Sequence, residues 1–440
     1  MTQPRLGPEA HILYVGAILP KRSETFVYRE VLGLRARGIE VSAASVHPPE
    51  RDLGDPALDA LAADAVPVYG RGGRAKLALA RDAARAAWWR PVRGLLENPT
   101  MYWPKYVLQS EAGYALAWRV RDRGITHVHA HMAHVPATVA MSCAEALEVP
   151  FSLTGHAADL FRDRSALKTK LQRASFVACI SQWHRRFYQQ QVPGLPDSRL
   201  PVIRCGVNLE EFAPVDPAAA DGRRLLAVGR LVPKKGFDVL LRAMARPAAA
   251  STRLTLVGDG PEEPALRELA TQLKLGDRVD FVGAKPNHAV RELMGEAGVF
   301  VLPCREAADG DRDGIPVVLM EAMARRVCVI SGDLETIREL VSDKVSGLMV
   351  RPGSVDELAE ALGTLADDAA LRGRLAEAGR ARVAQEFALG VTLDRLEQAF
   401  ATARIPPAPK SPPHGDPAPA DPPQPPTDND DRPAPGPDHA

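Results

Sequence analysis

Two carboxylates, Asp313 and Glu321, flank a short apolar segment in the second half of the chain, DGIPVVLMEAMA. The segment follows a β-rich run and a polar loop, and Pro316 suits the first turn of a helix because its missing N–H costs nothing there. The amides around Val317 and Val318 then face the loop and can hold a phosphate. The two carboxylates could hold separate polyol parts of one ligand, such as a sugar and a ribose. The alternative is an acidic loop before an amphipathic helix with Glu321 in solvent, but a helix this apolar favours a carboxylate that is buried or faces a cleft.

Cationic side chains follow another β-rich run, in GRLVPKKGFDVLL. Arg230 offers a planar fork of donors and Lys235 a point charge, and both suit a diphosphate. Gly236 lets the backbone come close to a ligand at the start of the next helix, whose N-terminus adds positive potential. Basic loop residues are usually just solvated, so this segment predicts a diphosphate site only together with the others.

Histidines gather at the ends of β-rich runs in the first half of the chain. His156 follows PFSLT, where its alternative role is to cap the next helix. His127, His129 and His131 alternate along one run and so point to one face of a strand. A metal hydrolase could use such a row, but no carboxylate cluster stands nearby in sequence, so we expect no bound metal. His131, at the carboxyl end of the run, is expected to line a ligand cleft.

The elements that position these residues form two series of β-rich runs alternating with helical patterns. Continuous apolar strands separated by helices predict parallel sheets covered on both faces, an α/β, doubly wound fold. Such sheets bind ligands outside the carboxyl ends of their strands, which is where the residues above lie. The runs of the first series are HILYVGA, VSAASV, HVHAHM, PFSLTG, SFVACIS and LPVIRC; those of the second are RLLAVGR, RLTLVGD, VDFVGA, VFVLPC, VCVISG and SGLMVRP.

The two series predict two similar domains joined by a Pro- and Ala-rich linker. A last helix is expected to pack back on the first domain, and the Pro-rich end cannot bury enough apolar surface to fold. A disordered tail is therefore expected there, with a proline-motif docking site as the less favoured alternative. The expected bounds are 1–205 for the first domain, 206–222 for the linker, 223–385 for the second domain, 386–404 for the last helix and 405–440 for the tail.

Composition suits a globular protein that works in a reducing compartment. Lys and Arg total 55, as do Asp and Glu, so net charge indicates no partner and nucleic acid is not expected. The five cysteines lie far apart in apolar stretches, which predicts buried free thiols. No apolar run is long enough for a signal peptide or a transmembrane helix, so a cytoplasmic location is expected.

The stretch from Arg71 to Tyr106 mixes several Arg and Lys residues with three tryptophans. Basic and aromatic residues on one helix suit an anionic membrane surface. A solvated helix face with its tryptophans packed inward explains the same pattern equally well.

Together these motifs resemble the retaining glycosyltransferases of family 4, which have the GT-B fold of two Rossmann-like domains facing across a cleft. The signature of that family is Glu, seven residues, then Glu-Ala-Met-Ala; here the second half is intact at Glu321, but the first carboxylate is Asp313. GRLVPKKG, LVGDGPE, FVGAKP and CGVNLEEFAP also match, so the resemblance spans nearly the whole chain except the tail. HVHAHMAHVPA and ISQWHRR resemble the bacterial branch that builds exopolysaccharides such as colanic acid.

The resemblance implies a role for each matching residue. His156 and Asp313 would lie at the reaction centre, with Asp313 on the donor sugar. Gly16 would allow close approach to the ligand, and the helix start that follows it would face the acceptor side. The implied donor-binding residues are Arg230 and Lys235 on the diphosphate, Gly283 beside the base, Gly314, Ile315, Val317 and Val318 around the sugar and phosphate, and Glu321 on the ribose; the implied acceptor-side residues are Gly16, Ser23, Glu24, Thr25 and His131.

The expected reaction moves a sugar from a UDP- or GDP-sugar to a glycan or lipid-linked glycan, with retention of anomeric configuration. Cations and helix amides would stabilise the departing diphosphate, so no obligatory metal or other cofactor is expected. A peripheral site at the cytoplasmic face of the inner membrane would suit such an acceptor. An NAD-dependent oxidoreductase would need a GxGxxG loop after a strand, which neither the first strand's loop nor GDGPEE supplies. A non-catalytic glycan- or nucleotide-binding protein on the same fold is the remaining alternative.

Overall fold

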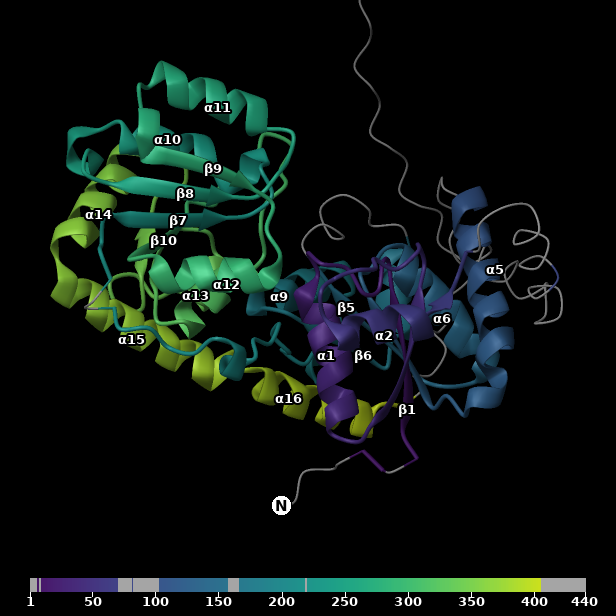
Figure 1. The fold of residues 1–440 in the computed structure, drawn as a ribbon. Helices are drawn as coiled ribbons and strands as arrows, with labels where there is room; N and C mark the ends of the chain where they lie inside the picture. Colours follow the sequence, from purple (N-terminus) through teal and green to yellow (C-terminus); the bar gives the residue numbers. More distant parts are fainter. Residues whose placement is uncertain are drawn as a thin grey trace, which may run out of the picture. The chain divides into compact units, whose positions relative to one another are not determined.

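The computed structural model describes residues 6, 7, 9–69, 81, 103–156, 166–217 and 220–404. The predicted tail and most of the basic and aromatic stretch between residues 71 and 102 lie outside these residues. The described part contains two six-stranded sheets, in the orders β3-β2-β1-β4-β5-β6 and β12-β11-β10-β7-β8-β9, and every strand pair is parallel (Figure 1). Each sheet reverses its strand order once, between β1 and β4 and between β7 and β10, so the two have the same doubly wound topology. The predicted fold class is confirmed.

The first sheet alternates its side chains between two layers of helices. Along β1, Leu13 and Val15 pack into a core with residues of α5 and α6, whereas Ile12 and Tyr14 pack into a second core with residues of α1, α2 and α16. The bounds are β1 (His11–Gly16), β2 (Glu40–Ser45), β3 (Val66–Pro67), β4 (His127–His131), β5 (Phe151–Gly155) and β6 (Phe176–Cys179), with α1 (Thr25–Ala36), α2 (Pro56–Asp64), α5 (Trp103–Val120), α6 (Val135–Leu147), α8 (Leu167–Arg173) and α9 (Gln182–Gln191).

The second sheet is covered in the same way, with α10 packed against α11 and α14, and α13 against α15 (Figure 1). Its strands are nearly continuous apolar runs, as expected of a parallel sheet buried on both faces. The bounds are β7 (Arg224–Val228), β8 (Arg253–Val257), β9 (Val279–Gly283), β10 (Val299–Leu302), β11 (Cys328–Gly332) and β12 (Leu348–Val350), with α10 (Phe237–Met244), α11 (Glu263–Gln272), α12 (Asn287–Glu296), α13 (Val317–Ala324), α14 (Val355–Asp367) and α15 (Ala369–Glu386).

The last helix, α16 (Leu389–Thr402), packs against α1 and the first sheet rather than the second. Leu393, Leu396 and Phe400 belong to the same core as Ile12 and Tyr14. The chain therefore returns to the first sheet after the second sheet is complete.

Two strands differ from the sequence-based expectation. The run LPVIRC forms only an isolated bridge between Cys179 and Val202, and the sixth strand of the first sheet is instead the two-residue β3. All five cysteines are buried and free, as predicted. Among the described residues, no helix combines the length and the apolar character needed to cross a bilayer.

Candidate functional site

The loops after β7, β8 and β9 pack tightly against one another at the carboxyl edge of the second sheet. A Cβ on Gly258 would lie 1.9 Å from the carbonyl oxygen of Gly229, so these two turns can meet only without a side chain. The amide of Leu231 donates to the carbonyl oxygen of Asp259 at 2.7 Å, and that of Gly258 donates to Gly283 at 3.0 Å. Gly283, expected beside the base, therefore belongs to the same rim as the GRLVPKKG loop.

The two predicted diphosphate ligands, Arg230 and Lys235, lie at this edge of the second sheet. Arg230 is exposed, and no described residue forms an ion pair or side-chain hydrogen bond with it. Lys235 lies in a short 3-10 turn that ends at Gly236, whose φ of +71° is the left-handed conformation that favours glycine. A Cβ on Gly236 would lie 2.2 Å from the carbonyl oxygen of Pro303, so the turn packs directly against the end of β10.

Lys235 and Asp313 form the centre of a nearly buried charge cluster, each side chain being 13% exposed. Lys235 Nζ lies 2.8 Å from Asp313 Oδ2, and Lys234 Nζ lies 3.5 Å from Asp313 Oδ1 and 3.1 Å from Asp311 Oδ1. Burial alone raises the pKa of Asp313, but the neighbouring Lys235 and Lys234 ammonium groups outweigh it, so the net pKa is below its ordinary value. Burial lowers the pKa of Lys235, and Asp313 more than compensates, so that pKa is raised. Both groups are thus held charged, and the structure brings these two predicted residues together.

The loop from Asp313 leads directly into α13. The hydroxyl of Thr336 donates to the carbonyl oxygen of Asp313 at 3.1 Å, and Ile315 is buried, which fixes the loop. Gly314 lies between them. Within the described part of the chain, the amides of Val317 and Val318 in the first turn of α13 donate no hydrogen bond, so they remain available to an anion.

Glu321, the predicted ribose ligand, is nearly buried and pairs with a residue that sequence reasoning missed. Arg29 Nη1 of α1 lies 2.9 Å from Glu321 Oε1, and Arg29 Nη2 lies 3.7 Å from a carboxylate oxygen of Glu211. Burial raises the pKa of Glu321 above its ordinary value, and Arg29 offsets only part of that shift. The one sequence signal for this pair was the charged dipeptide Arg29-Glu30 between apolar residues of one helix.

His156 and His131 lie in contact at the carboxyl edge of the first sheet, where β5 and β4 end. His131 Nδ1 is 3.2 Å from His156 Nε2, and His131 Nε2 is 2.9 Å from Glu30 Oε2. All three side chains are buried, and the ring of Phe26 lies 4.4 Å from that of His156. Burial lowers the pKa of His156 well below its ordinary value, and His131 adds to this effect. His156 is therefore uncharged near neutral pH.

The other histidines of β4 bind hydroxyls of β5. His129 lies 2.7 Å from Ser152 through Nδ1 and 3.0 Å from Thr154 through Nε2, and His127 Nε2 lies 2.7 Å from the same serine. Glu30, His129 and His131 each place a potential metal-ligand atom within 4.8 Å of the others. Both ring nitrogens of His129 are already held by hydroxyls, so the cluster is a hydrogen-bonded network rather than an open coordination site.

Of the five predicted acceptor-side residues, His131 ends β4, and the other four lie between the end of β1 and the start of α1. Gly16 ends β1, and a Cβ there would lie 3.0 Å from Leu19. Glu24 accepts a hydrogen bond from Lys21 at 2.6 Å, while Ser23 is exposed. Thr25 begins α1 and accepts a hydrogen bond from Arg29 at 3.4 Å, which links it to Glu321. Among the residues that the structure describes, no ion pair or side-chain hydrogen bond joins Ser23 or Glu24 to the charged residues above.

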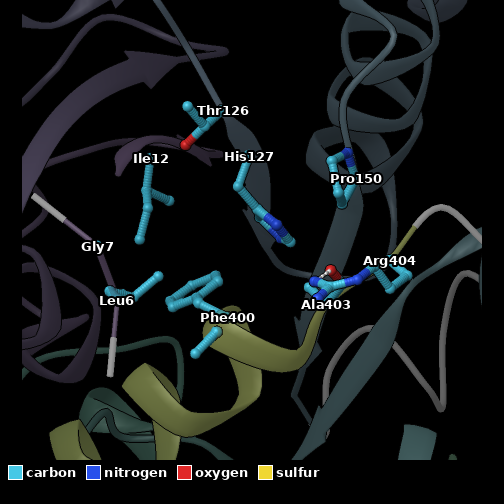
Figure 2. A pocket seen from close by; sticks show the side chains of 10 residues that line it. Leu6, Gly7, Ile12, Thr126, His127, Pro150, Phe400, Ala403 and Arg404 are labelled. Atoms are coloured by element: carbon cyan, nitrogen blue, oxygen red, sulfur yellow. Dashed lines mark hydrogen bonds between the residues drawn. The ribbon is translucent and has the colours of Figure 1, made fainter. Parts of the chain in front are cut away.

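A cavity of about 590 Å³ lies away from this chemistry (Figure 2). Ile12, Thr126, His127 and Pro150 lie at or just before the starts of their strands, so the cavity opens at the amino edge of the first sheet. Phe400 of α16 packs edge-on against His127 with 4.9 Å between ring centroids. In a doubly wound sheet ligands bind at the opposite, carboxyl edge, so volume alone does not mark the site.

Two family models together match most of the chain. One is described as Glycosyltransferase Family 4 and matches residues 23–211; the other is described as Glycosyl transferases group 1 and matches residues 210–382. Their junction falls between the two sheets.

Curated relatives carry glycosyltransferase names. The chain is 38% identical over 175 residues to the putative colanic acid biosynthesis glycosyltransferase WcaL of Escherichia coli, an alignment that covers 39% of this chain and 43% of the relative. It thus spans less than half the length of that relative. It is 30% identical over 323 residues to a GDP-mannose-dependent monoacylated alpha-(1-6)-phosphatidylinositol monomannoside mannosyltransferase of Corynebacterium glutamicum, covering 68% of this chain and 83% of the relative.

Among solved structures, the chain resembles Anabaena Alr3699/HepE in complex with UDP and glucose, with a TM-score of 0.68. The match covers 89% of this chain and 99% of the other at 17% sequence identity, which supports the fold alone.

Proposed function

Because this chain belongs to the group 1 glycosyltransferases of family 4, we propose that it transfers a sugar from a nucleotide diphosphate sugar to a glycan or lipid-linked glycan in the synthesis of a cell-surface polysaccharide. Its described relatives support this: one is named for colanic acid biosynthesis and another as a mannosyltransferase. The proposed site is the carboxyl edge of the second sheet, completed by α1 and by His156 of the first.

One observation carries the proposal: the contact between Lys235 and Asp313 at 2.8 Å, next to the unpaired amides at the start of α13. A donor diphosphate would take Asp313's place on Lys235 and would add contacts to Arg230 and to the helix amides. Asp313 would then be released toward the hydroxyls of the sugar. Lys235 would thus exchange one anionic partner for another. It would at no point be left as an unpaired, nearly buried cation, which would cost several kcal/mol.

The same cations would act most strongly as the bond to the leaving phosphate breaks, when charge develops on the diphosphate. They would serve where other enzymes use a divalent metal, so we propose no obligatory cofactor. His156 would approach the transferred sugar. We assign no described carboxylate as a nucleophile. We propose transfer with retention of anomeric configuration, in which the acceptor attacks on the face from which the phosphate departs.

The test is calorimetry and transfer assays with UDP- and GDP-sugars on the wild type and on Lys235→Ala and Glu321→Ala. We expect one nucleotide to bind, with its affinity reduced about 10–100-fold in either variant, because each loses a charge-assisted contact. Arg253→Ala, an exposed cation at the start of β8, is the control and should bind as the wild type does. Near wild-type transfer by both site variants would refute the assignment, and nucleotide-independent glycan binding would instead indicate a binding protein.

We also propose that the enzyme meets its acceptor at the cytoplasmic face of the inner membrane. The support is the name of the mannosyltransferase relative, which describes a phosphatidylinositol-based acceptor. Co-sedimentation with vesicles that contain anionic lipid tests this directly; a protein that stays in the supernatant at low salt would contradict it.

A further inference from the structure

The carboxylate of Glu339 connects the second sheet to elements of the first. Glu339 ends a 3-10 turn, Ile337–Glu339, that follows β11. Its Oε2 accepts the backbone N–H of Gln182 at 2.9 Å and a guanidinium N–H of Arg204 at 2.7 Å, and its Oε1 accepts the backbone N–H of Trp183 at 3.1 Å. The side chains of Glu339 and Arg204 are only 14% and 7% exposed, so water competes little for these contacts.

The start of α9 needs such an acceptor. The first amides of a helix have no acceptor within the helix itself. Ser181, the N-cap residue, accepts the third amide of α9 through its side chain, and the amides of Gln182 and Trp183 are left to Glu339. The positive end of the helix dipole and the charge of Arg204 both favour an anion here. Glu339 thus supplies, from the second sheet, a cap that α9 lacks in its own sequence.

The turn that ends at Glu339 also holds the loop of Asp313. Thr336, directly before the turn, donates from its hydroxyl to the carbonyl oxygen of Asp313 at 3.1 Å. Arg382 fixes the other end of the turn, because its Nη2 donates to the carbonyl oxygen of Glu339 at 2.9 Å. Movement of the α9 cap is therefore transmitted over three residues to the loop that carries Asp313.

α9 begins at the edge of the first sheet that carries His156. β5 and β6 are parallel neighbours, and Gly155 pairs with Cys179 at their ends. His156 follows β5 directly, and only two residues separate the end of β6 from the start of α9. Both therefore lie at the carboxyl edge of the first sheet. The contacts of Glu339 and Thr336 together join this edge to the Asp313 loop.

We propose that Glu339 is a positioning residue that fixes the loop of Asp313 relative to the edge of the first sheet that carries His156. It acts through Thr336 on one side and through the start of α9 on the other. The roles of Asp313 and His156 in transfer rest on the proposed function, but the mechanical link is a property of the free protein. Displacing reacting groups by about 1 Å can cost about 100-fold in rate, so a link of this kind affects catalysis without touching a substrate.

Glu339→Gln breaks the link with little change in volume. Both carboxylate oxygens of Glu339 accept hydrogen bonds, so whichever way the new amide is oriented, its NH₂ group faces at least one N–H donor. The charge that pairs with Arg204 is also lost. Glu335→Gln is the matched control, because Glu335 also pairs with α9, through Arg186, but both side chains are more than half exposed.

Methyl NMR of isoleucine in the ligand-free, full-length protein gives a readout that does not depend on activity. Ile315 lies in the loop after Asp313 and Ile180 lies just before α9, and both are buried. Their signals are assigned from those lost in the variants Ile315→Val and Ile180→Val. We expect both signals to shift or broaden in Glu339→Gln and neither to change in Glu335→Gln. An unchanged Ile315 signal in Glu339→Gln would overturn the proposal, even if the Ile180 signal moves.

Thr336→Val removes the other end of the link and leaves the cap of α9 in place. The Ile315 signal should change in this variant and the Ile180 signal should not. This result tests the link without Glu339→Gln, should that variant fail to fold, and an unchanged Ile315 signal would again count against the proposal.

Transfer assays test the consequence for catalysis. We expect kcat to fall about 10–100-fold in Glu339→Gln and in Thr336→Val, with the Kd for UDP or GDP within about threefold, because neither change touches Lys235. The double variant should be no slower than the slower single variant, because both changes break one link. Additive losses, a kcat within twofold of the wild type, or an equal loss of kcat and nucleotide affinity would each overturn the positioning role.

The two readouts separate this proposal from the proposed function. Coupled changes at Ile315 and Ile180 in a protein that transfers no sugar would retain the link and reject the proposed function. Transfer at the wild-type rate by Glu339→Gln would retain the function and reject the link.

Discussion

Replacing Arg29 with methionine isolates the contribution of the ion pair between α1 and α13. The substitution keeps the apolar stem of the side chain and removes the guanidinium that lies 2.9 Å from Glu321. Glu211 keeps a cationic partner, because Arg291 lies 2.9 Å from it. Glu321, only 13% exposed, is left without the guanidinium that neutralises it.

Breaking a buried pair in this way costs about 3–5 kcal/mol, since the remaining charge has been moved out of water without compensation. For a domain of this size each kcal/mol lowers Tm by about 2–4 °C, so the variant should melt roughly 10 °C below the wild type near neutral pH. Arg37→Met, at the residue that follows α1, removes more exposed ion pairs with Asp394 at 2.7 Å and Glu397 at 2.5 Å, and should cost only about 1 kcal/mol.

The penalty should depend on pH with a predictable sign. In the wild type, burial already raises the pKa of Glu321, and without Arg29 the folded-state pKa rises further above that of the unfolded chain. A raised carboxyl pKa destabilises the fold at pH values above the unfolded pKa of about 4.3 and costs nothing below it. The gap in Tm between the wild type and Arg29→Met should therefore narrow as the pH falls toward 4.

The assay is thermal unfolding across this pH range, together with nucleotide affinity. Glu321→Gln combined with Arg29→Met removes both charges and should recover most of the lost stability but not the affinity. A gap in Tm that is independent of pH, or a double variant no more stable than Arg29→Met, would show that Arg29 acts by packing and that the electrostatic reasoning is wrong.

Two further predictions concern the proposed diphosphate ligand Lys235, through its partner Asp313 and its neighbour Gly236. Asp313→Asn should cost about 3 kcal/mol near neutral pH by leaving Lys235 unpaired. Because the folded pKa of Asp313 is depressed, the pair's contribution is present above the unfolded pKa of about 3.9 and is lost as the pH falls through the folded value; denaturation curves whose difference persists in strong acid would contradict this. Gly236→Ala should destabilise the protein by more than the roughly 1–2 kcal/mol expected from left-handed backbone strain alone, because its Cβ would also meet the Pro303 carbonyl. Gly353→Ala, at φ +80° with open space around it, measures the strain term by itself, and an equal loss in both variants would refute the steric contribution.

The sequence was sufficient to predict features that depend on local pattern. Apolar runs located eleven of the twelve strands within a residue or two. The expectation that functional residues follow strands correctly singled out Lys235 and Asp313, which lie in contact. β3 was missed because a two-residue strand has no periodicity to detect. LPVIRC was predicted as a strand because its composition is right, but only Val202 forms a bridge to β6. Composition does not specify how many residues of an extended segment pair with a neighbouring strand.

The pairing of Arg29 with Glu321 could not be predicted locally, because 291 residues separate the two. The same holds for Glu30 and His131, which come together only when α1 packs on the sheet beside β4. A single sequence contains no record of such contacts unless a charged residue interrupts an apolar helix face, as these two do. That interruption is informative only after the fold is known.

The adjacent charges on α1 show how one helix can organise two parts of a site. Consecutive residues of an α-helix project about 100° apart, so Arg29 and Glu30 cannot share a partner easily, and each reaches a different element. Each buried ion would cost several kcal/mol alone, and both are retained because α13 supplies a carboxylate to one and β4 an imidazole to the other. Movement of α1 by even a fraction of a hydrogen-bond length would therefore weaken the hold on the ribose carboxylate and on His156 together. Nucleotide affinity and the NMR shifts of the His131 and His156 rings should consequently change in the same variants when α1 is displaced, for example by Val31→Ala beneath it, whereas independent responses would show that the two contacts are mechanically separate.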